Sequence, residues 1–224
     1  KTVTRWLIRE YMGAVILAAV LFLAAGRTDW FMGWALVAIT FAWVSANALI
    51  LIPRNPALLA ERMGPKRGAK RWDTVLMSII GVAILARLII AGLDVRYGWS
   101  AEIIPPLQVA ALVVAALAYA LVVWATAANA FFSQIVRIQH ERGHSVATGG
   151  PYRFVRHPGY VGTVLFELSV PVMLGSWWAL AVGVPIALLF VLRTALEDRT
   201  LRQELAGYQD FARQVRYRLI PAVW

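Results

Sequence analysis

The amino-acid sequence predicts an all-α fold: a polytopic membrane protein of about six transmembrane helices, with a polar pocket on the cytoplasmic face and a C-terminal amphipathic helix. Three observations support this prediction. Of the 224 residues, 60% are hydrophobic and only 15% are charged, whereas roughly a quarter of the residues in soluble domains are charged. Several apolar runs approach or exceed the ~20 residues that a helix needs to cross a bilayer. Basic residues also concentrate in alternate connections between those runs, as the orientation of membrane proteins requires.

Six apolar runs define the predicted transmembrane helices: residues 11–25, 31–52, 74–93, 106–132, 160–174 and 177–192. The first run follows a basic start, which is also a feature of signal peptides. Because further apolar runs follow and no polar domain does, we interpret it as a signal anchor. The last two runs are short and are joined by Gly-Ser-Trp-Trp, so they predict a tight helical hairpin that is tilted or incompletely spanning. Pro171 and Pro185 interrupt this hairpin, which membrane helices tolerate when neighbouring helices satisfy the freed backbone groups.

Two polar parts of the chain are expected to form amphipathic structure. The connection 53–73 predicts a short helix over 57–63 that ends at Gly64-Pro65. A solvated basic loop lying on lipid headgroups is favoured for this connection over a catalytic function. Near the end of the chain, apolar residues recur at helical spacing and predict an amphipathic helix on the membrane surface. These residues are Leu201, Leu205, Tyr208, Phe211 or Ala212, and Val215.

The basic residues predict the orientation of the protein. When the connections are assigned alternately to two sides, most of the 22 Lys and Arg residues fall on one side, in the segments 1–9, 54–71, 137–156 and 193–218. The positive-inside rule then places both termini and these connections in the cytoplasm. The net charge of +10 is thereby explained by orientation and by anionic lipid headgroups, and we predict no nucleic-acid partner.

The chain has no cysteine, which excludes a disulfide framework, a thiolate metal site and a cysteine nucleophile. We predict no metal site. Because no internal repeat or low-complexity linker divides the sequence, residues 1–224 are expected to form one membrane domain. Residues 1–128 contain helices of less specific sequence, whereas residues 129–224 contain all three histidines and most of the polar groups suited to chemistry.

The polar stretch 149–162, GGPYRFVRHPGYVG, is the clearest candidate site. Its glycines and first proline prevent a regular helix and leave backbone N–H groups for a ligand. Pro158 suits the first turn of the next helix, whose N-terminus beside His157 and Tyr160 would attract a carboxylate. Tyr152 and Tyr160 can flank a planar ring and donate hydrogen bonds. The alternative is an interfacial belt of Tyr and Arg at headgroup depth.

Charged residues just after the last apolar run and inside two of the other runs form a second set of candidates. Arg193 and Glu197 are one helical turn apart and share a stripe with Leu201. They could bind one anionic and one cationic ligand group at the lip of a cavity, or form a structural salt bridge with each other. Glu167 and Arg87 lie within apolar segments, where ionisable residues are functional candidates. Glu167 is expected to line a lipid tunnel or to pair structurally with Arg87.

These motifs resemble those of the isoprenylcysteine carboxyl methyltransferase family, which are integral-membrane methyltransferases that use S-adenosylmethionine. The resemblance is carried by GPYRFVRHPGYVG, a helical hairpin, R-x3-ED-x2-L and GY-x2-F-x3-V. It covers residues 129–224, whereas residues 1–128 match only in being helical and apolar. The resemblance implies methyl transfer from S-adenosylmethionine to a membrane-embedded, lipid-like acceptor, above all the carboxylate of an isoprenylcysteine-type substrate. The Ala-, Arg- and Val-rich composition suggests a bacterial member in the inner membrane.

The resemblance also implies which residues act. The implied cofactor-binding residues are Arg137, His144, Ser145, Val146, Ala147, Tyr152, His157, Pro158, Gly159, Tyr160 and Glu197. Arg193 matches the arginine that meets the substrate, and Arg193 and Glu197 together are the implied catalytic residues. Arg137 stands where eukaryotic members have a glutamine contact, which brings a cation near a sulfonium; the nearby Gln139 is the alternative for that contact.

Two other functions fit parts of the sequence. NADPH-dependent membrane reductases of the sterol type resemble the chain in an Arg-His-Pro element and in a tail like VRYRLIPAVW, but they are usually larger and lack the fit to R-x3-ED. A non-catalytic lipid-binding protein would explain the basic face but not the convergence of His157, Tyr160 and Glu197. The acceptor is also open, because related members methylate other lipids and phospholipid amines are chemically suitable.

Overall fold

The computed structural model describes residues 2–64 and 68–224. Lys1, Lys66 and Arg67 of the predicted basic segments, and Pro65 of the predicted helix stop, lie outside the described residues. Within them the secondary structure is entirely helical, which confirms the predicted fold class. The helices are α1 (Thr2–Ala25), α2 (Phe31–Arg54), α3 (Pro56–Met63), α4 (Arg71–Tyr97), α5 (Pro105–Ala128), α6 (Pro158–Met173), α7 (Trp177–Glu204) and α8 (Tyr208–Gln214), with 3-10 turns η1 (His140–Arg142) and η2 (Gly150–Arg153).

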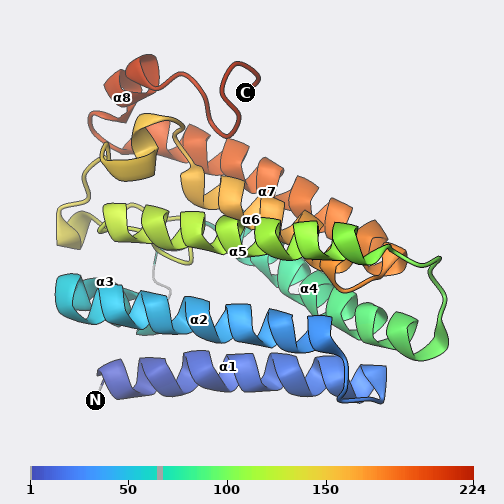
Figure 1. The fold of residues 1–224 in the computed structure, drawn as a ribbon. Coiled ribbons are helices and arrows are strands. Elements are labelled where there is room, and N and C mark those ends of the chain that lie inside the picture. Colours follow the sequence, from blue (N-terminus) through green and yellow to red (C-terminus); the bar gives the residue numbers. More distant parts are fainter. Residues whose placement is uncertain (1, 65–67) are drawn as a thin grey trace.

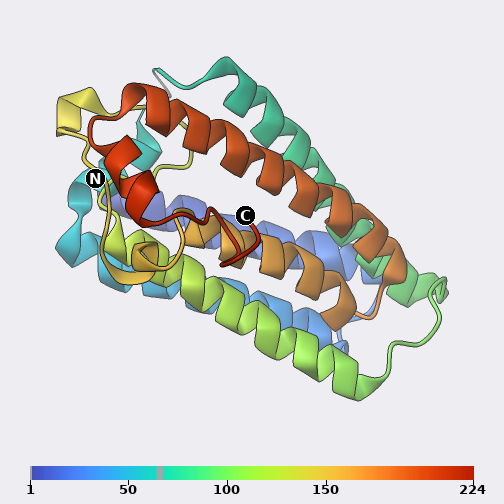
Figure 2. The same cartoon turned by 90° about the horizontal axis from the view of Figure 1, so that it is seen from above.

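The long helices pack side by side in a ring (Figures 1 and 2). Helix α1 contacts α2 and α4, α2 contacts α5, α5 contacts α6, α6 contacts α7, and α7 returns to α4. The connections α1–α2, α4–α5 and α6–α7 lie at one end of the ring. The other end, called here the cavity end, carries α3, the connection between α5 and α6, and α8 with the C-terminal tail (Figure 1).

Five of the described helices, α1, α2, α4, α5 and α7, are long and apolar enough to cross a membrane. The protein is therefore an integral membrane protein, as predicted. Helix α6 has 16 residues, about 24 Å at 1.5 Å per residue, and is shorter than the ~30 Å hydrocarbon core. Helix α7 was expected to be short as well, but it has 28 residues. It continues beyond residue 192 because the charged side chains of its last turns find partners inside the protein.

The α6–α7 hairpin is tight, as the sequence predicted. Gly175 turns the chain with φ +82°, and Ser176 begins α7 by accepting a hydrogen bond from the N–H of Ala179. The two helices then approach closely at Gly183, where an added Cβ would lie 2.8 Å from the carbonyl oxygen of Glu167. At the same depth an aromatic stack of Trp43, Tyr119 and Phe166 crosses the ring, with centroid distances of 5.4 and 3.7 Å. Aliphatic side chains fill the ring on the far side of this stack.

Helix α3 differs from the favoured interpretation of the 53–73 connection as a solvated loop. Asn55 begins the helix by accepting from the N–H of Leu58. Leu58 and Leu59 are fully buried and pack with Trp6 of α1 and Leu51 of α2. The apolar face of α3 therefore belongs to the core of the protein, because α1 provides a hydrophobic surface for it.

The predicted C-terminal amphipathic helix was wrong in its continuity. Helix α7 ends at Glu204, Gly207 adopts φ +79°, and the separate helix α8 follows. This break folds the apolar stripe back onto the protein. Leu205, Tyr208, Phe211 and Ala212 are buried against Ala125 of α5 and Tyr152. The stripe thus packs on the cavity end of the ring (Figure 1).

Candidate functional site

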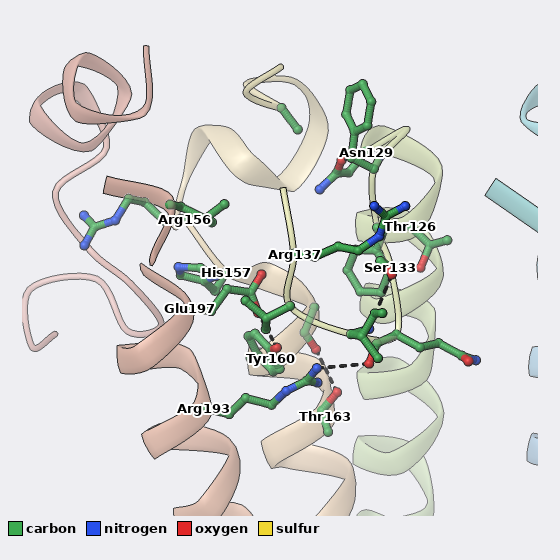
Figure 3. Close-up of a pocket in the computed structure, with 18 of the residues that line it drawn as sticks. Thr126, Asn129, Ser133, Arg137, Arg156, His157, Tyr160, Thr163, Arg193 and Glu197 are labelled. Atoms are coloured by element: carbon green, nitrogen blue, oxygen red, sulfur yellow. Dashed lines mark hydrogen bonds between the residues drawn. The ribbon is translucent and has the colours of Figure 1, made fainter. Parts of the chain in front are cut away.

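A cavity of about 540 Å³ opens at the cavity end of the ring, lined by residues of α2 to α8 and of the α5–α6 connection. Its size lies within the ~300–1,000 Å³ typical of small-molecule sites. Of the candidate residues, those that line it are Arg137, His144, Ser145, Val146, Ala147, Tyr152, His157, Gly159, Tyr160, Arg193 and Glu197. Pro158 and Glu167 do not. The structure therefore brings together most of a set that is spread over 60 residues of sequence (Figure 3).

The start of α6 has the geometry that the sequence predicted. His157 is the N-cap residue and Pro158 occupies the first turn. Pro158 shapes the turn without lining the cavity. Gly159 is required by a close approach, because an added Cβ would lie 2.7 Å from the ring of Phe132. The His157 and Tyr160 side chains reach the cavity from this turn (Figure 3).

Glu197 of α7 accepts a hydrogen bond from the Tyr160 hydroxyl at 2.5 Å, as Figure 3 shows. The Arg193 guanidinium lies over the same tyrosine ring, 5.4 Å from its centroid. Tyr160 therefore separates a carboxylate from a guanidinium within one wall of the cavity. This arrangement offers one acceptor and one donor group to a ligand that carries both charges.

Arg193 does not pair with Glu197, so the alternative of a salt bridge between them was wrong. Its partner is Asp73 of α4, with Nε–Oδ1 at 2.7 Å and Nη2–Oδ2 at 3.2 Å. Nη2 also donates to the carbonyl oxygen of Gln134. Among residues 2–64 and 68–224, Nη1 of Arg193 has no hydrogen-bond partner. This nitrogen remains available to a ligand in the cavity.

Asp73 is a site residue that sequence reasoning missed. It is fully buried and accepts a second hydrogen bond, from the N–H of Val136 at 2.8 Å. It therefore ties α4, α7 and the α5–α6 connection together at the cavity. Its only sequence signal was an acidic residue immediately before the predicted membrane helix 74–93, beside Trp72.

Asp198 forms a second network that the sequence did not reveal. The fully buried carboxylate accepts hydrogen bonds from Arg156 at 2.7 Å and Tyr208 at 2.9 Å, and lies 3.4 Å from Nε2 of His157. Arg202 and Arg218 also donate to it. Burial, and then the Asp198 charge, raise the pKa of the Tyr208 hydroxyl, which keeps it protonated as a donor. Asp198 thus fixes His157 between α7, α8 and the C-terminal tail.

The connection between α5 and α6 forms the opposite wall. His144 stacks on Phe131 with ring centroids 4.5 Å apart, and its Nδ1 accepts from the N–H of Gln139 at 3.3 Å. Burial, reinforced by the Arg142 charge, lowers the pKa of His144 to about 4. The ring is therefore neutral near pH 7 and presents a flat, uncharged surface to the cavity.

Arg137 lines the cavity but its charge is neutralised. It pairs with Glu61 of α3 at 2.5 Å and with Glu141 at 2.6 Å, and these bonds raise the pKa of Arg137 and lower that of Glu61. The conflict between this cation and a sulfonium is thereby reduced. Gln139, the expected substitute, does not line the cavity: it is fully buried, and its amide donates to the carbonyl oxygen of Phe131.

Glu167, expected either to line a lipid tunnel for the acceptor or to pair structurally with Arg87, lies outside the cavity lining. It is buried beside Arg87 of α4, with the Arg87 Nη1 to Glu167 Oε2 distance at 3.1 Å. Nη1 of Arg87 also approaches the carbonyl oxygen of Glu167. The structural pairing that we considered as the alternative is therefore what the structure shows.

Comparison with known proteins gives these residues a family context. Residues 103–203 match the model of the isoprenylcysteine carboxyl methyltransferase family, which confirms the resemblance expected from the motifs. The matched segment runs from just before α5 to the end of α7. It contains His157, Tyr160, Arg193 and Glu197, whereas α1 to α4 lie outside it.

Individual relatives each match a part of the chain. A probable protein-S-isoprenylcysteine O-methyltransferase of Oryza sativa subsp. indica is 33% identical over 86 residues, which are 38% of this chain and 45% of the relative. Protein-S-isoprenylcysteine O-methyltransferase B of Arabidopsis thaliana is 30% identical over 86 residues, 38% of this chain and 44% of the relative. The chain thus spans under half the length of these curated relatives. A solved structure of a eukaryotic intramembrane Ras methyltransferase is 19% identical, with a TM-score of 0.49 over 96% of this chain and 85% of the other.

Proposed function

We propose that this chain, whose residues 103–203 match the isoprenylcysteine carboxyl methyltransferase family, transfers a methyl group from S-adenosylmethionine to a lipid-like acceptor. The acceptor is most consistent with the carboxylate of an isoprenylcysteine-type substrate. The observation that carries this proposal is the joint position of His157, Tyr160, Glu197 and Arg193 in one cavity. The cavity is lined by these polar side chains and by apolar ones such as Trp43, Met77 and Phe190.

The residues present fit S-adenosylmethionine, which supplies an activated methyl group on a sulfonium. Its ammonium would be held by Glu197, whose carboxylate Tyr160 orients. Its carboxylate would be held by His157, which Asp198 and Tyr208 fix in place. Its adenine would lie against the apolar cluster that Tyr152 shares with the covering tail and against the wall of residues 144–147, where the neutral ring of His144 adds no charge.

Arg193 is the residue that would hold the acceptor. Asp73 fixes two of its nitrogens and leaves Nη1 toward the cavity. A guanidinium can grip one oxygen of a carboxylate while the other oxygen attacks the methyl group. Since the acceptor is already ionised, the reaction needs no general base, and its rate depends on alignment at ~3–3.5 Å in a site shielded from water. The acceptor chain would lie along Trp43, Met77 and Phe190, which line the deeper part of the cavity.

The same proposal covers location and partners. The basic segments at the cavity end support an orientation with both termini and the cofactor site in the cytoplasm, and we propose the bacterial inner membrane as the location. The acceptor would be a lipid, or a prenylated small molecule or peptide, that enters from the bilayer. The donor would enter from the aqueous side.

The test is transfer of a deuterated methyl group from labelled S-adenosylmethionine into lipid extracts and into a synthetic S-prenylcysteine, analysed by mass spectrometry. We expect label in the ester of the prenylcysteine. Transfer of hydride from labelled NADPH would favour a reductase. Absence of both transfers, together with no stabilisation by S-adenosylhomocysteine at millimolar concentration, would refute the proposal.

A further inference from the structure

One cation of the cavity is not used by the proposed chemistry. Arg62 of α3 lines the cavity. Its Nη2 donates to the carbonyl oxygen of Phe132 at 3.0 Å, and its guanidinium lies 5.9 Å from the centre of the Phe132 ring. Its Nε is buried and has no hydrogen-bond partner in the described part of the chain. Arg62 lies outside residues 103–203, the segment that matches the family.

Arg62 differs from the other guanidinium groups of the cavity, because each of those is neutralised by a carboxylate. The pairs are Arg193–Asp73, Arg137–Glu61 and Arg156–Asp198. Within residues 2–64 and 68–224, no carboxylate forms a salt bridge with Arg62; Glu10, which lies near it, pairs with Arg9. Residues 1 and 65–67 are Lys, Pro, Lys and Arg, so none of them carries a side-chain carboxylate.

A guanidinium held in this way is costly for the unliganded protein. Burial lowers the pKa of Arg62 to about 10, against a smaller opposing effect of the Glu10 charge. The residue as a whole is only half-buried, but its enclosed Nε and the lack of a carboxylate partner still disfavour the charged form in the unliganded protein. The protein nevertheless holds Arg62 firmly at the cavity, since the backbone of the same residue accepts a hydrogen bond from Arg9 at 2.9 Å. This combination is typical of a binding group whose partner is a ligand.

We propose that Arg62 is a second anion-binding residue of the cavity and that, in addition to Arg193, it holds the anionic head of the lipid-like acceptor, a carboxylate or a phosphate. The inference rests on the proposed function for the identity of the donor. Glu197 and His157 already serve the donor's charged end, whereas Arg62 lies on the wall made by α2 and α3. Deeper on that wall, Trp43 lines the apolar part of the cavity. A cation at the membrane surface above an apolar surface fits an amphiphile with an anionic head.

The experiment compares Arg62→Gln with wild-type full-length protein in detergent. The matched control is Arg54→Gln, which removes the same charge from an exposed residue at the end of α2. Binding is measured by microscale thermophoresis for three probes: N-acetyl-S-farnesylcysteine, its uncharged carboxamide, and S-adenosylhomocysteine. Melting temperatures of the unliganded proteins are recorded in parallel. Arg62→Lys, which keeps a point charge, is included in case Arg62→Gln fails to fold.

We expect Arg62→Gln to weaken binding of the carboxylate probe about tenfold or more, since a charge-assisted hydrogen bond is lost. Binding of the carboxamide and of S-adenosylhomocysteine should not change, and the unliganded melting temperature should stay equal or rise. Arg62→Lys should bind the carboxylate with intermediate affinity, and Arg54→Gln like the wild type.

Three results would overturn the inference. Unchanged affinity for the carboxylate probe would show that Arg62 does not bind the acceptor. Weaker binding of S-adenosylhomocysteine alone would assign Arg62 to the donor's carboxylate. A lower melting temperature with all affinities retained would make Arg62 structural. If wild-type protein binds the carboxylate probe but not S-adenosylhomocysteine, the proposed function fails while the anion site at Arg62 stands.

Discussion

Asp73 and Arg193 form a two-point ion pair although 120 residues separate them in the chain. The pair joins the first turns of α4 to the last turns of α7, at the level where Tyr160 and Glu197 line the cavity. A guanidinium fixed at two nitrogens loses less rotamer freedom when it binds a ligand with its remaining nitrogen. Asp73 is therefore expected to act through Arg193, as a positioning residue.

The first prediction concerns Asp73→Asn. The amide cannot neutralise Arg193, so methyl transfer should fall at least tenfold while S-adenosylhomocysteine binds as in the wild type. Asp73→Ala should also lower the free energy of unfolding by ~3–5 kcal/mol, the usual cost of leaving one partner of a buried pair uncompensated. Radiolabel transfer and thermal unfolding measure the two effects. Asp29→Asn, at an exposed acid, is the control. Equal losses of methyl transfer in Asp73→Asn and Asp29→Asn would argue against a positioning function.

The second prediction separates Arg193 from the donor-binding residues. Arg193→Ala should abolish methyl transfer and leave S-adenosylhomocysteine affinity nearly unchanged. Arg193→Lys should restore stability toward wild type, because an ammonium still neutralises Asp73, but should recover little activity, because it cannot reproduce the planar fork. Isothermal titration and a transfer assay on the same preparations check this. Donor affinity falling in step with activity would contradict the assignment of Arg193 to the acceptor.

The third prediction concerns the donor's amino-acid end. Glu197→Gln and His157→Ala should each weaken S-adenosylhomocysteine binding by ~1–3 kcal/mol, since each removes a charge-assisted hydrogen bond. Tyr160→Phe should have a smaller effect, because it only frees Glu197 from its hydrogen bond. Titration calorimetry measures all three. Normal affinity in both Glu197→Gln and His157→Ala, with folding verified, would place the donor elsewhere.

The fourth prediction is a pH dependence of stability. The pKa of His144 is lowered by burial from 6.5 to about 4, so the unfolded chain binds more protons than the folded protein between these values. The stability due to the neutral ring is complete above about pH 6.5 and is lost as the pH falls toward 4. His144→Gln should therefore flatten the dependence of melting temperature on pH in this window. His140→Gln, at an exposed histidine of the same connection, should retain the wild-type dependence; a retained slope in His144→Gln would show that another group causes it.

The fold could be predicted from the sequence to the extent that it depends on local hydrophobicity. Apolar runs located all six long helices, and Gly-Pro punctuation located the stretch 149–162 at the start of α6. The length of α7 could not be predicted in this way. Its last turns are polar in sequence. They remain helical because Asp73, Arg156 and Arg218 supply ionic partners that only the folded protein brings near.

The same limit applies to the candidate site. Glu197 and Tyr160 were identified because both lie in recognisable motifs. Asp73 and Arg62 were missed, since one is paired across 120 residues and the other belongs to a helix whose burial depends on Trp6 and Leu51. The break at Gly207 was also missed, because the apolar spacing continues through it and a single glycine is a weak signal within a helical pattern.

The short length of α6 determines where a water-soluble ligand and a membrane lipid could meet. Gly159, near its start, approaches Ala125 of α5, and Gly175, just past its end, approaches Gln108. Helix α6 has 16 residues against 24 in α5, so it is shorter by roughly 12 Å at 1.5 Å per residue, and both of its ends are recessed from the ends of α5. The recess at the cavity end places His157 below the level at which the neighbouring helix α5 ends. A water-soluble donor can descend to that depth under the cover of α8, and an amphiphile can present its head there without being extracted from the bilayer. Removal of α8 by proteolysis or mutation would consequently admit water to the cavity beside His157. The route by which a lipid enters between the helices would stay intact.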